Sequence, residues 1–79
     1  MKLPRDLSGA DLAKALTRLG YRITRQTGSH LRLTTELPAQ HHVTIPAHDP
    51  LKVGTLSGIL GDVAAHLKLD RDALLQRLF

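Results

Sequence analysis

The chain has 79 residues and a 42% hydrophobic content with one phenylalanine, one tyrosine and no tryptophan, which allows one domain with a small aliphatic core. It has no cysteine, which excludes disulfides and thiolate metal sites, and no apolar run approaches the about 20 residues that span a membrane. The formal net charge is +4, and residues 1–32 hold seven cationic residues against two acidic ones, a distribution that attracts polyanions. We therefore expect one domain over residues 1–79, in a reducing cytoplasm and without membrane attachment. Residues 1–6 also lack the apolar stretch of a signal peptide.

The first predicted element is a helix over residues 8–19. Ser8 and Asp11 have the spacing of a capping box, and Gly20 is placed to end the helix in the left-handed conformation. Between these ends, leucines recur at the spacing of one helical stripe, at Leu12, Leu16 and Leu19. The stripe predicts which side of the helix faces the core.

Three short runs of alternating residues follow, at 21–26, 30–34 and 41–45, and the short links between them predict an antiparallel meander. Alternation puts the apolar side chains on one face and four polar ones on the other, namely His30, Arg32, His42 and Thr44. The first two runs are joined by a tight turn, in which Gly28 is expected to supply the backbone freedom of a reversal. A bulge at this turn would break the shared polar face.

A second helix is predicted from Gly54, with Thr55 as its N-cap and an apolar stripe that covers the sheet. Gly58 and Gly61 fall opposite the stripe, either because another backbone approaches closely or because the helix is simply weak. Asp70 is expected to cap a short third helix, whose leucines must pack on the domain or dock to a partner. The elements together indicate an α+β fold, with a core over about residues 8–67 and an additional C-terminal helix at 69–79.

The side chains that could carry chemistry are mainly histidines. A zinc site usually includes cysteines or a histidine pair four residues apart on a helix, and neither is present, so we expect no metal or other cofactor. Ser29 and His30 are neighbours on a predicted strand and would point to opposite faces, so a nucleophile–base pair is not expected. What remains is a histidine that moves a proton, with cations that bind phosphate.

RNA suits this set of residues, because its 2′-hydroxyl can attack the adjacent phosphorus once a base removes the proton. His30 is the candidate base or acid, and the candidate RNA-binding residues are the nearby cations Lys14, Arg18, Arg22, Arg25 and Arg32. The same residues also fit an ordinary hairpin with a surface histidine and a solvated basic face. Two other function classes stay open, an RNA-binding module without activity and a protein-interaction domain whose partner covers the basic face.

Five short motifs follow one another in a distinctive order, over about residues 8–67. They are Ser8-Gly9, Leu19-Gly20-Tyr21, Gln26-Thr27-Gly28-Ser29-His30, Val43-Thr44-Ile45-Pro46-Ala47-His48, and Gly54-Thr55-Leu56 with Ile59-Leu60. In this order they resemble the HicA family of bacterial toxins.

The resemblance implies a fold like the double-stranded-RNA-binding domain, α-β-β-β-α, with the helices on one face of a three-stranded antiparallel sheet. It implies a metal-independent endoribonuclease that cleaves mRNA and inhibits translation, and a HicB-type antitoxin that binds the toxin in a hetero-oligomer and neutralises it. It assigns His30 as the catalytic residue, with Gly28 and Ser29 as the motif that positions it. His48 matches a recurring family position and is a secondary candidate.

Overall fold

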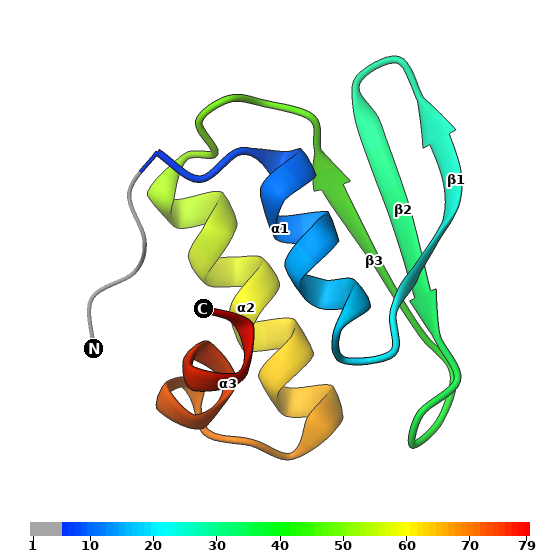
Figure 1. Cartoon of the computed structure of the whole chain (residues 1–79), viewed down its shortest axis with the longest axis vertical. Coiled ribbons are helices and arrows are strands. Elements are labelled where there is room, and N and C mark those ends of the chain that lie inside the picture. The colour runs from blue at the N-terminus through cyan, green and yellow to red at the C-terminus, as the bar shows by residue number, and fades with distance from the viewer. Residues whose placement is uncertain (1–5) are drawn as a thin grey trace.

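A computed structural model describes residues 6–79 and shows three antiparallel strands with α1 and α2 over one face of the sheet and α3 beyond α2 (Figure 1). The elements in chain order are α1 (Gly9–Thr17), β1 (Arg22–Thr27), β2 (His30–Thr35), β3 (His41–Pro46), α2 (Val53–Leu67) and α3 (Arg71–Leu78). The predicted α+β fold and its element order are therefore confirmed. Residues 1–5 lie outside the described residues. They include the cations Lys2 and Arg5 and all but Asp6 of the segment considered for a signal peptide.

The capping box at the start of α1 is formed as predicted. Ser8 Oγ accepts a hydrogen bond from the Asp11 amide at 3.0 Å, and the Asp11 carboxylate accepts one from the Ser8 amide at 3.4 Å. The helix ends at Thr17, two residues earlier than predicted, and Gly20 follows it with a φ of 99°, in the left-handed region. Leu12 and Leu16 are fully buried, as the stripe predicts.

Gly9 brings the start of α1 against the end of β3. A Cβ atom at this position would collide with the carbonyl of Pro46, so only glycine allows the two backbones to approach this closely. The Gly9 amide donates a hydrogen bond to the carbonyl of His48 at 2.9 Å. The first and fourth motifs, far apart in the sequence, thus meet in one backbone junction.

The sheet has the strand order β1-β2-β3, so β2 is central and both of its neighbours are edge strands. The inward side chains of β2 and β3 form the core with α1 and α2, and they include Leu31, Leu33, Val43 and Ile45. The pairing of β1 with β2 shifts between Ile23 and Arg25, which makes Thr24 an extra residue in the edge strand. The bulge therefore lies inside β1 and not at the glycine turn.

The start of α2 differs from the prediction. The helix begins at Val53 after Lys52, which makes no side-chain capping bond, so Thr55 is not the N-cap. Thr55 lies inside the first turn, because the carbonyl of Lys52 already accepts a helical hydrogen bond from the Leu56 amide at 2.9 Å. Within residues 6–79, no helix is long and apolar enough to cross a bilayer.

The last helix, α3, packs on α2. Of the two alternatives for its leucines, packing on the domain and docking to a partner, the structure shows the first. Asp70 caps α3 by accepting a hydrogen bond from the Ala73 amide at 2.7 Å, and three of its leucines are buried, Leu74, Leu75 and Leu78. At Gly61 the close neighbour is the Arg71 side chain, which also donates to Ser57 Oγ at 2.8 Å. No atom lies within 4 Å of a Cβ built on Gly58, so of the two alternatives left open a close approach applies only at Gly61, and there it involves a side chain and not a backbone.

Candidate functional site

The face of the sheet that no helix covers carries three rows of residues, each crossing all three strands. We call this surface the open face. From the hairpin turn onwards, the turn row, the middle row and the distal row are Thr27–His30–Pro46, Arg25–Arg32–Thr44 and Arg22–Thr34–His42. The shared face predicted for His30, Arg32, His42 and Thr44 is confirmed by this register. None of the three strands contains an acidic residue.

The bulge in β1 decides which arginines reach the open face. With strict alternation, Arg22 and Arg25 would point to opposite sides of the sheet. Because Thr24 is the extra residue, Arg25 pairs with Arg32 while Arg22 pairs with Thr34, and both arginines share the open face. Sequence reasoning missed this, because alternation alone does not reveal where an edge strand gains a residue.

His30 lies in a hollow of about 220 Å³ together with Arg25 and Arg32. The hydroxyl-bearing residues Thr27 and Thr44 complete its lining. All five residues are exposed, so the imidazole and the two guanidinium groups are open to a ligand. Two guanidinium groups beside an imidazole can bind a phosphate and leave the ring free to move a proton.

Ser29 fixes the orientation of the His30 ring. Its Oγ atom lies 2.9 Å from His30 Nδ1, at hydrogen-bonding distance. The prediction that these two side chains point to opposite faces is wrong, because Ser29 belongs to the turn and not to β2. With Nδ1 held by the hydroxyl, Nε2 is the nitrogen left for a ligand.

The turn itself is held by the segment that follows β3. The carbonyl of Ser29 accepts a hydrogen bond from the Ala47 amide at 2.9 Å, next to the junction of Gly9 with the segment after β3. Gly28 does not have a left-handed backbone, since Gly20 is the glycine with positive φ among residues 6–79, and a Cβ on Gly28 would meet no atom within 4 Å. The expectation that Gly28 supplies special backbone freedom at this turn is therefore wrong. His48 contributes its carbonyl to the same junction, and its side chain is exposed.

The two cations predicted on α1 lie on the helix side, away from His30. Lys14 lines a groove between α1 and β1 with Ile23, whose side chain is 49% exposed. Arg18 donates a hydrogen bond to the carbonyl of Leu78 at 3.2 Å, which ties α1 to the end of α3. The structure brings Arg25 and Arg32 to His30, places Arg22 one row beyond Arg25, and does not bring Lys14 or Arg18 there.

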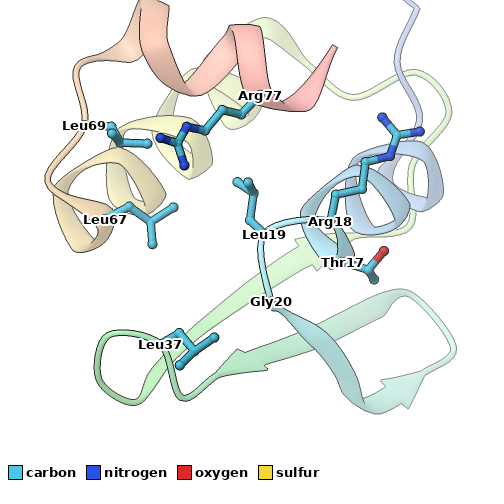
Figure 2. Close-up of a pocket in the computed structure, with 8 residues that line it drawn as sticks. All are labelled: Thr17, Arg18, Leu19, Gly20, Leu37, Leu67, Leu69 and Arg77. Atoms are coloured by element: carbon cyan, nitrogen blue, oxygen red, sulfur yellow. The ribbon is translucent and has the colours of Figure 1, made fainter.

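A larger hollow, of about 600 Å³, lies at the end of the molecule remote from the glycine turn. Figure 2 shows Leu19, Leu67 and Leu69 around it, with the guanidinium of Arg77 beside Leu69 and the guanidinium of Arg18 directed away. Its lining is leucine-rich and contains no histidine or carboxylate. It therefore offers space but no group that could transfer a proton.

Two further histidines, His41 and His66, form a cluster on the covered side of the sheet. Tyr21 Oη is 2.7 Å from His41 Nδ1, His41 Nε2 is 3.3 Å from Asp62 Oδ1, and the ring of His66 stacks on His41 at 4.3 Å. Burial, and to a lesser extent the negative charge of Asp62, raise the pKa of Tyr21 to about 12. Both ring nitrogens of His41 are engaged by protein groups, so this cluster joins β3 to α2. Within residues 6–79, no three histidine or acidic side chains converge as metal ligands.

The fold and the hollow define a class of protein, a small α+β domain with a histidine and two arginines in a hollow on an open sheet face. Among known protein families, residues 9–64 match the one described as the HicA toxin of bacterial toxin-antitoxin systems. The chain belongs to this family, and is thus a toxin with a cognate antitoxin partner. Comparison with curated proteins found no match, and neither did comparison with solved structures.

Proposed function

We propose that this toxin is a metal-independent endoribonuclease that cleaves mRNA in the cytoplasm and that a HicB-type antitoxin neutralises it. Residues 1–79 would form one domain. The observation that carries it is the hollow in which His30 lies beside Arg25 and Arg32 on a face without acidic residues. Membership of the toxin family supports the same function.

His30 would act as the base. In the tautomer with its proton on Nδ1, the ring donates to Ser29 Oγ and presents an unprotonated Nε2 to the hollow. Nε2 removes the proton from the ribose 2′-hydroxyl, and the 2′-oxygen attacks the adjacent phosphorus. The bond from phosphorus to the 5′-oxygen breaks, which leaves a 2′,3′-cyclic phosphate on one product and a 5′-hydroxyl on the other.

Arg25 and Arg32 would bind the phosphate and stabilise the negative charge that builds up on it during attack. The leaving 5′-oxygen takes its proton from solvent, since the hollow is open and no second imidazole lines it. Gly28 and Ser29 would position the His30 ring, because they form the turn that precedes it at the start of β2. Lys14, Arg18 and His48 are proposed only as outer contacts to the RNA chain.

The test uses purified protein and single-stranded RNA of mixed sequence, without added metal and with a chelator present. The wild type should produce fragments that end in a cyclic phosphate, and His30→Ala should lose about 10²–10⁴-fold in rate. Cleavage by His30→Ala at the wild-type rate would overturn the assignment of the base. Binding of RNA without any cleavage by the wild type would leave an RNA-binding module instead.

A further inference from the structure

We infer that the distal row forms a second RNA-binding subsite, and that the substrate is an extended single strand lying across the open face from His30 to His42. This inference rests on the proposed function and names the form of its substrate. It concerns His42 and Arg22, which lie outside the hollow that contains His30.

The distal row repeats the arrangement found at His30. His42 Nδ1 is 2.7 Å from Thr34 Oγ1, as His30 Nδ1 is 2.9 Å from Ser29 Oγ. Thr34 Oγ1 is held in turn by Thr24 Oγ1 at 2.9 Å, and Thr34 is 96% buried beneath its neighbours, since only 4% of its surface is exposed. A buried hydroxyl thus orients an exposed imidazole, whose Nε2 is left for a ligand, and Arg22 stands in the same row.

The rows are spaced to follow a chain of phosphates. Thr34 lies four positions after His30 along β2, which is about 13 Å in an extended strand. The middle row lies halfway and carries Arg25 and Arg32, so every row offers a cation or an imidazole. One bound phosphate at His30 cannot reach the distal row, but the next nucleotides of an extended strand can.

The composition of the surface favours a single strand over a duplex. The open face holds imidazole and guanidinium planes on which unpaired bases can stack, and a duplex hides its bases from such contacts. The reaction also favours a single strand. The 2′-oxygen must move into line with the leaving oxygen, and the regular geometry of a duplex resists that movement. The absence of acidic residues from all three strands makes the entire path electrostatically favourable to RNA.

The subsite is tested by binding, in a form that does not depend on cleavage. His30→Ala serves as background, and the probes are fluorescent 2′-O-methyl RNA strands of mixed sequence, about two and about eight nucleotides long, together with a duplex of the longer strand. We expect Arg22→Gln and His42→Ala each to weaken binding of the longer strand about tenfold, the loss of one charge-assisted hydrogen bond. Binding of the short strand should not change.

Lys68→Gln is the matched control, because it removes one positive charge at the C-cap of α2, outside the three strands that form the open face. It should lower the affinity for the longer strand by less than either distal-row variant. Unchanged binding in both distal-row variants, an equal loss for both strand lengths, or tighter binding of the duplex would each overturn the inference. Failure of the wild type to cleave RNA, with these binding differences intact, would overturn the catalytic proposal alone.

Discussion

The two faces of the sheet each carry histidines, and the contacts of these rings differ in a way that separates function from folding. On the open face, His30 has one hydroxyl partner on Nδ1 and lies in a hollow with two arginines. On the covered side, His41 has Tyr21 on one nitrogen, Asp62 on the other and His66 stacked on its ring. An imidazole with both nitrogens occupied holds the protein together, and one with a free nitrogen beside cations can act on a phosphate.

The difference follows from which elements surround each ring. His41 starts β3 and faces α2, so helix side chains complete its contacts. His30 starts β2 on the side without helices, where its surroundings come from the neighbouring strands and the turn. Changes on the open face should therefore alter cleavage without altering stability, and changes on the covered side should do the reverse.

The largest expected effect tests that separation directly. His30→Ala should lose about 10²–10⁴-fold in cleavage rate, and its free energy of unfolding should stay within about 0.5 kcal/mol of the wild type. His41→Ala should lose about 1–3 kcal/mol of stability, since it leaves a buried hydroxyl unpaired, while its folded fraction cleaves at the wild-type rate. Urea unfolding and initial cleavage rates measure both. Loss of activity in both variants at equal folded fraction would abolish the distinction.

The next largest effect is expected on stability, at the junction between Gly9 and the end of β3. Gly9→Ala should destabilise the protein by about 3 kcal/mol, because its methyl group would collide with the carbonyl of Pro46. Gly58→Ala is the control, since its methyl group meets open space in α2 and should stabilise the helix by about 0.5–1 kcal/mol. Thermal unfolding of both variants measures the contrast, and equal stability of the two would contradict the close approach at Gly9.

A smaller effect is expected at the residue that orients His30. Ser29→Ala should lower kcat about fivefold with KM unchanged, as expected when a hydrogen bond worth about 1 kcal/mol is lost from a positioned base. Ser29→Thr keeps the hydroxyl and should restore most of the rate. Steady-state kinetics on one RNA substrate distinguish the outcomes, and a change in KM alone would assign Ser29 to RNA binding.

The effect that appears only at alkaline pH lies on the covered side. The pKa of Tyr21 is about 12 in the folded protein against 10 in the unfolded chain, so burial favours its neutral form. Its contribution to stability is complete below pH 10 and is lost as the pH rises through about 12, because the unfolded chain releases this proton first. Tyr21→Phe should be less stable than the wild type at neutral pH, and its stability should fall less steeply above pH 10.

Tyr21 is the only tyrosine in the chain, so tyrosinate absorbance follows its ionisation without interference. Ionisation near pH 10 in the folded protein would show that the ring is exposed and that the covered cluster is not formed. The open face should be insensitive to the same substitution, and His30-dependent cleavage at neutral pH provides that control.

Local sequence determined much of the fold. The capping box of Ser8 and Asp11, the leucine stripe of α1 and the cap at Asp70 depend on neighbours within one helical turn, so spacing alone predicted them. Alternation along β2 and β3 likewise predicted which side chains share a face with His30. These features need no knowledge of distant parts of the chain. The site residues whose positions follow from alternation could thus be predicted, including Arg32 and Thr44.

The tertiary structure decided the rest, because pairing and close approach involve residues far apart in sequence. The extra residue at Thr24 becomes a bulge only through the register with β2, and that register brings Arg25 to His30. Gly9 is required by the path of Pro46, and the Leu51 amide, just before α2, bonds to the carbonyl of Leu7, 44 positions earlier in the chain. Tyr21, His41 and Asp62 meet only after α2 has packed on the sheet. Spacing specifies local hydrogen bonds and faces, whereas long-range packing specifies which faces and which charges come together.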